Sequence, residues 1–384
     1  MTTLQLISKT LILLTLALIN LSEAVASKEY IYIGTFKGRE SEGIYVYEFN
    51  RNDRSFTQVQ VLKSKESPGF LSIHPTKKYL YAVNNEGVAT DSNNGSVSAF
   101  KIDPASGKLE LINEVSAKGK GPCHISIDPK GEFAYVSNYS SGSLVAYRIL
   151  GDGSLSEATD VVQHEGSSIN PSRQKEPHMH SAIPSTDGKF IFASDLGIDK
   201  IAVYQIIRQS GKLEATGDPG IANPGAGPRH FTIHPGGKFA YSAEELTSTV
   251  STYAKNKSTG SLSAIQHISM LPDDYQGLGN SAADIHTSPD GKFLYASNRG
   301  HDSLVIYEID QRTGKLSLIG HSPTLGGHPR NFCMDSQGEF VLVANRDADN
   351  VVLFERDKTK GTLSPAEVEL NIPMAVCVIQ LILP

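Results

Sequence analysis

HPGGKFAYSAE, from His234 to Glu244, is the stretch that decides the fold, because variants of it return along the whole chain. Five further copies are HPTKKYLYAVN from His74, DPKGEFAYVSN from Asp128, STDGKFIFASD from Ser185, SPDGKFLYASN from Ser288 and DSQGEFVLVAN from Asp335. A degenerate seventh copy, KEYIYIG, starts at Lys28. Successive copies lie about fifty residues apart, which indicates an internal repeat.

The six full copies join a tight turn, most often Pro-x-Gly, to a run of alternating large and small residues, the pattern of a strand entered from a turn. A second alternating run such as SLVAYRI and a shorter one such as KLSLIGH follow. About four antiparallel strands per repeat is the content of a propeller blade, and seven copies predict seven blades. A solenoid is the competing interpretation, but its repeats are usually shorter and more evenly spaced. We therefore predict an all-β, seven-bladed β-propeller that occupies residues 28–384 as one domain.

Residues 1–27 differ from the repeats. Lys9 precedes an apolar stretch from Leu11 to Leu21, and small residues follow at Ala24 and Ala26. This layout is typical of a cleavable secretory signal, and the stretch is short for a membrane span. We expect a signal peptide over residues 1–27, export to the periplasm or the exterior, and no membrane span after cleavage. An uncleaved anchor and a disordered tail are the alternatives.

Composition excludes several classes of partner and bounds the cysteine chemistry. The net charge is −6 without a basic stripe, so neither nucleic acid nor an anionic membrane is an expected partner. Cys123, Cys333 and Cys377 lie in strand-like stretches, allow at most one disulfide and are interpreted as small core residues. No metal-site spacing occurs apart from the pair His178 and His180, which lacks a carboxylate or cysteine at a recognisable distance. We expect neither a metal nor a cofactor.

Polar residues concentrate where the strands of four repeats begin or end. Equivalent ends of successive blades converge on one mouth of the central channel, so residues about fifty positions apart become neighbours there. The dense segments are PHMH from Pro177, GPRH from Gly227 with EEL from Glu244, DIH from Asp284 with NRG from Asn298, and HPRN from His328 with NR from Asn345.

These polar residues also have plainer interpretations. His124, His180, His230 and His286 are expected to occupy one place, a few residues before a turn, where packing between blades would explain them. An arginine within a strand-rich repeat needs solvent or a carboxylate, and Glu245 is the candidate partner for Arg229.

Long phrases of the chain resemble the seven-bladed propeller lactonase family, which contains the propeller type of 6-phosphogluconolactonase and the fungal carboxy-cis,cis-muconate cyclase. The resemblance covers residues 28–384. The phrases are YIGTF from Tyr32, SRQKEPHMHSA from Ser172, SDLGIDKIAVY from Ser194, GAGPRHFTIHPGGKFAYSAEELTSTV from Gly225, ASNRGHDSL from Ala296 and HPRNFCMDSQGEFVLVANRDADNVVLF from His328.

The resemblance implies a catalytic set and a surrounding substrate-binding set. The catalytic residues that it implies are His180, Arg229, Glu245 and Arg299. The substrate-binding residues that we expect around them are Arg173, His178, His230, His286, Arg330 and Asn331. Gln174 accompanies Arg173 in a phrase that the family uses, and both are expected near an acid group of the ligand. Glu244 replaces the usual asparagine and Arg346 the usual glutamine, so substrate choice is expected to differ.

The residue chemistry suits the opening of a sugar-type lactone, as in 6-phosphogluconolactonase. Ring opening passes through a tetrahedral oxyanion, which Arg229 and Arg299 are expected to stabilise while Glu245 or His180 deprotonates the attacking water. No GxSxG elbow occurs, which favours direct attack by water over a nucleophilic serine. Two alternatives stay open: cyclisation of a muconate-type dicarboxylate, and a secreted propeller that binds a ligand or a protein without catalysis.

Overall fold

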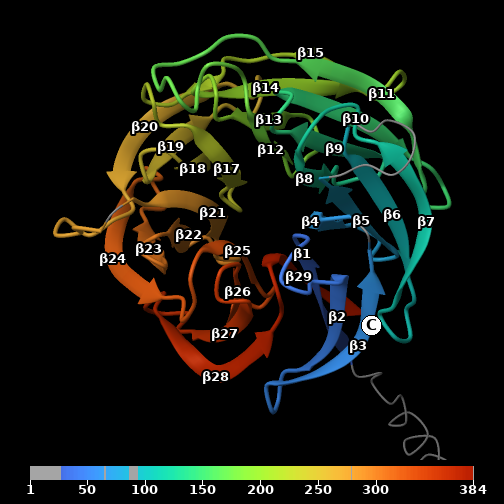
Figure 1. Cartoon of the computed structure of the whole chain (residues 1–384). Coiled ribbons are helices and arrows are strands. Elements are labelled where there is room, and N and C mark those ends of the chain that lie inside the picture. The colour runs from blue at the N-terminus through green and yellow to red at the C-terminus, as the bar shows by residue number, and fades with distance from the viewer. Residues whose placement is uncertain (1–26, 65, 86–93, 278, 384) are drawn as a thin grey trace, which may run out of the picture.

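The computed structural model describes residues 27–64, 66–85, 94–277 and 279–383, and their strands form a ring of seven sheets around a central opening (Figure 1). Apart from Ser27, the predicted signal segment lies outside these described residues. Every regular element within them is a strand, and they contain no helix long and apolar enough to cross a membrane. The predicted all-β, seven-bladed propeller is confirmed.

Each blade is an antiparallel sheet with four main strands, numbered here from the blade that joins the two ends of the described chain. Blade 1 contains β29 (Ala375–Leu383), β1 (Lys28–Thr35), β2 (Gly43–Asn50) and β3 (Ser55–Lys63). Blade 2 contains β4 (Pro68–Ile73), β5 (Tyr79–Asn84), β6 (Ser96–Ile102) and β7 (Leu109–Ser116). Blade 3 contains β8 (Pro122–Ile127), β9 (Phe133–Asn138), β10 (Ser143–Ile149) and β11 (Leu155–Gln163).

The remaining four blades follow in chain order around the ring. Blade 4 contains β12 (Met179–Pro184), β13 (Ile191–Asp195), β14 (Lys200–Ile207) and β15 (Lys212–Ala215), with a short β16 (Gly220–Ile221) also paired to β14. Blade 5 contains β17 (Pro228–Ile233), β18 (Phe239–Glu244), β19 (Thr249–Lys255) and β20 (Leu262–Ser269). Blade 6 contains β21 (Ser281–Thr287), β22 (Phe293–Arg299), β23 (Ser303–Ile309) and β24 (Leu316–Pro323). Blade 7 contains β25 (Pro329–Met334), β26 (Phe340–Asn345), β27 (Asn350–Arg356) and β28 (Leu363–Asn371).

The repeated phrase forms the turn from the innermost strand of a blade to its second strand. Gly131 and Gly237 adopt φ values of 72° and 69° in this turn, a left-handed conformation that glycine takes without a steric penalty. Lys77 holds the same conformation in blade 2, with φ 63°. The Lys28 copy lacks the turn because β1 pairs with β29, which arrives from the other end of the chain.

Side chains of the repeated phrase also fasten each blade to the next one. The imidazole of His74 in blade 2 donates through Nε2 to the carbonyl oxygen of Gly131 in blade 3 over 2.9 Å. The buried hydroxyl of Tyr81 donates to the carbonyl oxygen of Gly153 over 3.0 Å. The same two links join blade 5 to blade 6, through His234 with Gly291 and Tyr241 with Gly314. The aromatic and histidine positions of the repeat therefore serve the contact between blades.

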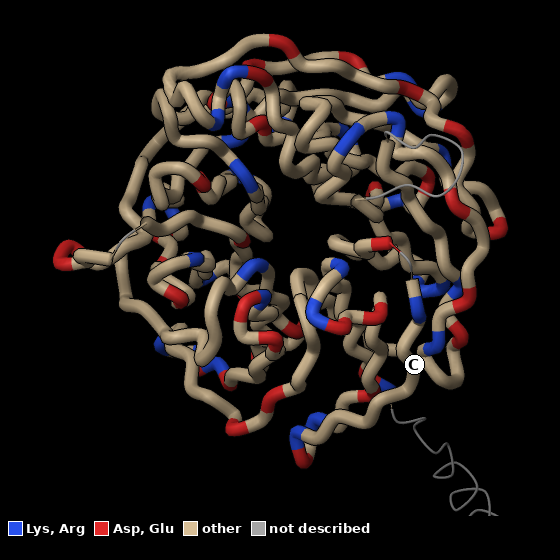
Figure 2. The backbone as a smooth tube through the Cα atoms, in the orientation of Figure 1, with Lys and Arg blue, Asp and Glu red and all other residues tan. Residues whose placement is uncertain are grey.

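Strands β1 and β29 close the ring. Their antiparallel pairing runs from Lys28 opposite Leu383 to Thr35 opposite Ala375, so blade 1 draws its innermost strand from the C-terminal end of the described chain. Figure 2 shows acidic and basic residues mixed around the outer rim of the ring. Several basic positions also lie beside the central opening, where the candidate site is found.

Candidate active site

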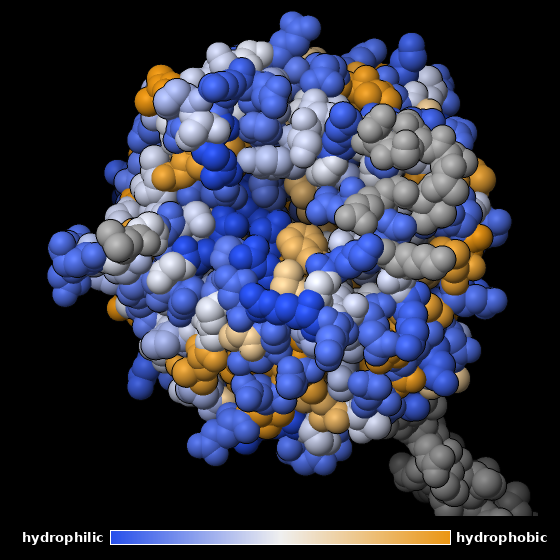
Figure 3. Space-filling model, in the orientation of Figure 1, coloured by the Kyte–Doolittle hydropathy of each residue, from blue (hydrophilic) through white to orange (hydrophobic). Residues whose placement is uncertain are grey.

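Two adjoining cavities occupy the centre of the face seen in Figure 3, where the surface is hollowed. Strongly hydrophilic residues gather on one side of the hollow and apolar residues on the other. The outer cavity, about 290 Å³, is lined by Asn85, Gly121, Cys123, Tyr139, Ser140, Arg173, His180, Glu245, Arg299 and Arg330. The inner cavity, about 30 Å³, is lined by Phe36, Gly69, Phe70, Asn85, Pro122, Cys123, Arg229, His230, Arg330, Asn331 and Val376. Asn85, Cys123 and Arg330 belong to both linings.

A β-bulge near the start of the innermost strands aims side chains into these cavities. The pairing of β17 with β18 shifts between Pro228 and His230, which leaves Arg229 as the extra residue. Strands β12 and β25 shift in the same way at His180 and Arg330. These three residues therefore occupy one structural position in three blades. Because a bulge changes the direction of a side chain, all three face the channel.

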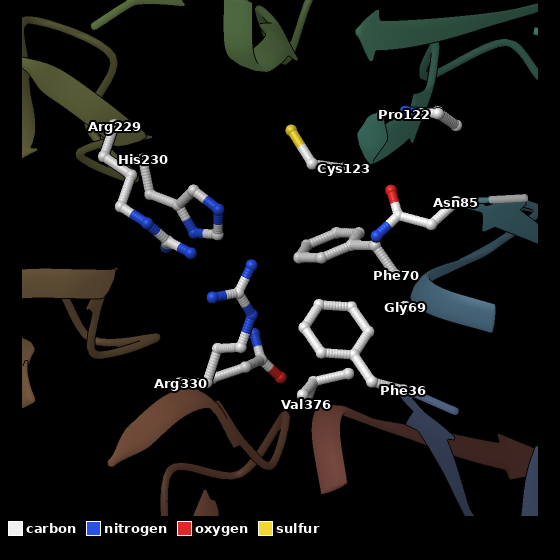
Figure 4. Close-up of a pocket in the computed structure, with 11 residues that line it drawn as sticks. Phe36, Gly69, Phe70, Asn85, Pro122, Cys123, Arg229, His230, Arg330 and Val376 are labelled. Atoms are coloured by element: carbon white, nitrogen blue, oxygen red, sulfur yellow. The ribbon is translucent and has the colours of Figure 1, made fainter. Parts of the chain in front are cut away.

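Cys123 holds this same bulged position in β8. Figure 4 shows its thiol in the space that Arg229 and Arg330 also enter. The interpretation of Cys123 as a core residue is therefore wrong. Burial raises the pKa of this thiol to about 12, so it is uncharged at neutral pH. Cys377 does lie in the core, fully buried, and all three cysteines are unpaired.

Glu245 is the electrostatic centre of the outer cavity. It follows the last residue of β18 and forms ion pairs with three arginines. Its Oε2 lies 3.0 Å from Arg229 Nε and 3.0 Å from Arg299 Nη2, and its Oε1 lies 2.6 Å from Arg173 Nη2. Burial alone would raise the pKa of Glu245, but the arginines outweigh it and lower that pKa to about 2. The carboxylate is therefore ionised and fully engaged.

Backbone carbonyls of β21 hold the two buried arginines in place. Arg229 donates through Nη1 to the carbonyl oxygen of Ala283 over 2.6 Å, and Arg299 donates through Nη2 to that of Ala282 over 2.6 Å. Burial and the nearby Arg229 lower the pKa of Arg299 to about 10, so it keeps its charge at neutral pH. These contacts fix both guanidinium groups beside Glu245.

Arg330 differs from the other arginines of the site. Among the described residues, none accepts a hydrogen bond from its guanidinium or forms an ion pair with it; its contact is with the face of Phe36, 4.9 Å from the ring centre. Burial and repulsion from Arg229 and Arg299 lower the pKa of Arg330 to about 9. Figure 4 shows this guanidinium projecting into the middle of the inner cavity.

An aromatic side chain that the sequence analysis did not single out, Tyr139, organises the opposite wall. Its ring stacks on His178 with centroids 4.5 Å apart, and its hydroxyl accepts from Arg173 Nη2 over 3.0 Å. His180 meets the same ring edge-on at 5.5 Å. Burial and the charge of Arg229 hold the pKa of His180 well below its usual range, so this imidazole is neutral. His178 backs Tyr139 and lines neither cavity.

Asp284, the first residue of the polar segment DIH, connects three innermost strands beneath the site. It is 2% exposed and accepts from His230 Nδ1 over 2.7 Å and from Asn331 Nδ2 over 2.6 Å. The Asn331 Oδ1 atom in turn accepts from the backbone of Val378 over 2.7 Å, so both ends of this amide serve the scaffold. His286 donates to Asp284 over 2.9 Å and lines neither cavity.

The expectation that four histidines share one place is wrong in detail. His124 and His230 do share a register position, opposite Ser137 and Ala243. His180 lies one position earlier, at the bulge, and His286 lies two positions later along its strand. Counting back from the first residue of each repeated phrase separates them, because His124 and His230 lie four residues before it, His180 five and His286 two. A shift of one residue changes the face that a side chain reaches.

Two further expectations are corrected by burial. Gln174 is fully buried and donates to the carbonyl oxygen of Leu196 and to Asp199, so it braces its loop and does not face a ligand. Glu244 is also fully buried and accepts from the hydroxyl groups of Ser251 and Thr249. It lines neither cavity, so Glu245 is the carboxylate of the site. No group of three or more His, Cys, Asp or Glu side chains arranged to hold a metal ion occurs among the described residues.

The chain is thus a seven-bladed propeller with an arginine-rich, carboxylate-centred channel mouth. Residues 30–380 match the model of the family described as Lactonase, 7-bladed beta-propeller. The chain belongs to this family, and with it to a class of lactone hydrolases.

Relatives in two bacteria bear the name 6-phosphogluconolactonase. The one from Formosa agariphila is 39% identical over 312 residues, which cover 79% of this chain and 86% of the relative. The one from Bacillus subtilis is 34% identical over 304 residues, covering 79% and 84%. Among solved structures, a periplasmic gluconolactonase from Pseudomonas aeruginosa has a TM-score of 0.86 at 31% identity and covers 93% of this chain and 100% of its own.

Proposed function

We propose that this chain hydrolyses a sugar-type lactone by direct attack of water on the carbonyl carbon, without a metal ion and with an arginine stabilising the oxyanion. The names of the related proteins support the substrate class, because they denote the opening of gluconolactone or its 6-phosphate. The scaffold supports the mechanism, because the channel mouth presents fixed cations to a small enclosed space.

The observation that carries the proposal is the free guanidinium of Arg330. A partly buried cation without a counter-charge among the described residues is unfavourable, and the repulsion from Arg229 and Arg299 adds to that cost. A ligand that brings negative charge removes both penalties. The oxyanion of a tetrahedral intermediate has this charge, and the planar fork of arginine donates two parallel hydrogen bonds to such a group.

The other charged residues have supporting roles in this proposal. Arg173, Arg229 and Arg299 surround the single carboxylate of Glu245, so the channel mouth carries an excess of positive charge even before Arg330 is counted. That excess favours an anionic group such as the phosphate of a phosphorylated lactone, as well as the oxyanion. Both Glu245 oxygens already accept from arginine, so a histidine is the favoured base.

We further propose that the chain acts outside the cytoplasm. The apolar stretch from Leu11 to Leu21 supports this proposal, and so does the periplasmic gluconolactonase among the similar solved structures. Cell fractionation with an antibody against the propeller tests it: recovery of the protein in the periplasm or the medium is expected. Recovery with the cytoplasmic fraction would contradict export and would favour a phosphorylated, intracellular lactone.

Hydrolysis of a small panel of lactones tests the proposed activity. The panel contains 6-phosphogluconolactone, gluconolactone and a muconolactone, and the spontaneous rate is subtracted for each. We expect one of the two sugar lactones to be hydrolysed by the wild type and to be lost as a substrate in Glu245→Gln and Arg229→Ala. Glu244→Gln is the matched control, because Glu244 is a buried neighbour that does not face the cavities. A rate no greater than the blank with every sugar lactone would contradict the proposal.

A further inference from the structure

His230 presents an unused nitrogen to the inner cavity. Its Nδ1 lies 2.7 Å from Asp284 Oδ1, while its Nε2 is buried without a hydrogen-bond partner among the described residues. Neighbouring histidines hold the pKa of Asp284 well below its usual range despite its burial, so Asp284 is a carboxylate and only accepts. Nδ1 must therefore carry the hydrogen, which leaves a lone pair on Nε2.

Asp284 fixes the orientation of this imidazole firmly. Besides His230, its two oxygens accept from His286, from the side chain of Asn331 and from the backbone N–H groups of Ile285 and Phe332. The donors come from β17, β21 and β25, so the carboxylate is held by three blades at once. A carboxylate that orients a histidine and selects its tautomer is the arrangement that prepares an imidazole to accept a proton.

The inner cavity offers the space for the molecule that would give up this proton. Its volume of about 30 Å³ exceeds the 10–15 Å³ or so that one water requires. His230 and Arg330 both line it, and Figure 4 shows the imidazole and the guanidinium bordering the same space, opposite Phe36 and Phe70. A water placed there would have an acceptor in Nε2 and a donor in Arg330, and it would adjoin the outer cavity where a lactone would lie.

The two other candidate bases are less suited to this task. Both oxygens of Glu245 are engaged by arginines. His180 has no carboxylate partner among the described residues, and its Nδ1 lies 3.8 Å from the thiol of Cys123. Arg229 holds the pKa of His180 well below its usual range, in addition to the larger effect of burial.

We propose that His230, oriented by Asp284, is the general base that deprotonates the attacking water, an inference that rests on the proposed lactone hydrolysis. The proton passes from water to Nε2 as the water oxygen forms its bond to the carbonyl carbon. The bond from that carbon to the ring oxygen then breaks, and the imidazolium returns its proton to the leaving alkoxide. Water and lactone give a hydroxy acid, and His230 is restored.

The charged and titratable groups around the imidazole set its protonation. They are Arg229 on its own strand, Asp284 and His286 on β21, Arg330 on β25, His180 on β12 and His124 on β8. Burial and Arg229 lower the pKa of His230 to about 4, although Asp284 raises it. The imidazole is therefore unprotonated at neutral pH and ready to accept. Activity is expected to fall as the pH drops through the pKa of this residue.

His230→Asn and His124→Asn in the full chain form the decisive pair. Asparagine at 230 keeps a donor for Asp284 but lacks Nε2, whereas His124 shares the register position and has no carboxylate partner among the described residues. We expect His230→Asn to lower kcat by about 100-fold or more with KM little changed, and His124→Asn to stay within a few-fold of wild type. A wild-type kcat in His230→Asn, while Glu245→Gln is inactive, would overturn the base assignment and leave lactone hydrolysis standing.

Imidazole rescue separates a missing base from a damaged fold. His230→Ala opens a space continuous with the inner cavity, so added imidazole is expected to restore its rate at least tenfold, saturably and in proportion to the unprotonated fraction. No rescue in a His230→Ala protein whose thermal unfolding matches wild type would overturn the assignment. If His230→Ala does not fold, the pH profiles of Asp284→Asn and wild type decide, and an unmoved acidic limb contradicts it. A wild type inactive on every lactone would overturn the proposed function itself.

Discussion

Arg229 and Glu245 form an ion pair with 3.0 Å between Nε and Oε2, and both residues are at most 6% exposed. Both belong to blade 5, where Arg229 lies at the bulge of β17 and Glu245 directly follows the last residue of β18. Arg299 and Arg173 reach the same carboxylate from neighbouring parts of the ring. One carboxylate therefore holds three cations together.

Glu245→Gln is expected to lower both stability and activity. The amide cannot neutralise three arginines, and an uncompensated buried charge costs about 3 kcal/mol or more. We expect the free energy of unfolding to fall by that order and lactone hydrolysis to be lost. Urea denaturation followed by circular dichroism measures the first effect at pH 7. An unchanged denaturation midpoint would show that solvent or ions replace the carboxylate.

The stability difference between wild type and Glu245→Gln is expected to depend on pH. Burial of the Glu245 carboxylate raises its pKa, but the three arginines outweigh this effect and lower the pKa from its ordinary value of 4.5 to about 2. A carboxyl whose pKa is lower in the folded state stabilises the fold above the ordinary value and loses that effect as the pH falls through the folded value. The two unfolding free energies should thus converge between about pH 4.5 and pH 2.

Glu244→Gln is expected to show the opposite trend. Burial raises the pKa of Glu244 to about 7, partly offset by the hydroxyl groups of Ser251 and Thr249. In this range the folded state binds a proton that the unfolded state has released, so wild-type stability falls as the pH rises from 4.5 to 7. The variant has no such carboxyl, so its relative stability should increase over that range, by on the order of 3 kcal/mol. Parallel thermal scans from pH 4 to pH 8 would contradict this if both proteins changed alike.

Arg330→Met is expected to lower activity without lowering stability. The substitution removes a cation that has no counter-charge among the described residues and that Arg229 and Arg299 repel. We expect an unchanged or raised Tm and a loss of lactone hydrolysis of about 100-fold. Arg356→Met is the control, since Arg356 is bound to Tyr295, Asp290 and a backbone carbonyl. Loss of stability is expected there, and an equal loss in Arg330→Met would contradict the role assigned to Arg330.

Tyr81→Phe tests the fastening of one blade to the next. The change removes the 3.0 Å hydrogen bond to Gly153 but keeps the buried ring. We expect the free energy of unfolding to fall by about 1 kcal/mol, because a buried carbonyl loses its partner. Lactone hydrolysis should be unaffected, since Tyr81 lines neither cavity. A selective loss of activity would contradict a purely structural role.

The repeated phrase was sufficient to predict the architecture because its turn and strand recur in every blade. The topology also explains why the Lys28 copy lacks the turn: the innermost strand beside β1 is β29, which comes from the other end of the chain. The phrases around His180, Arg229 and Arg330 also pointed to one mouth of the channel. The fold brings these three residues to one bulged position, which explains why a similar phrase precedes the turn in each of those blades.

The detailed roles could not be predicted, because they depend on register and on partners remote in sequence. His230 and His286 looked equivalent, yet one borders the inner cavity while the other supports Asp284 from outside it. Tyr139 and Cys123 gave no motif signal, although aligning the repeats one residue before His124 would have placed Cys123 with Arg229. Among the described arginines of the site, Arg330 is the one without an acceptor, and no local sequence pattern indicates this.

Because β29 closes the ring, the site is completed only when this strand has been made. Val376, on β29, forms part of the wall of the inner cavity, and the backbone N–H of Val378 donates to the side-chain oxygen of Asn331, whose amide nitrogen donates to Asp284. A nascent chain emerging from the ribosome has already exposed every arginine of the site before this strand is made. The chamber nevertheless stays open on one side until the strand docks, so translation must pass residue 378 before a competent enzyme can exist.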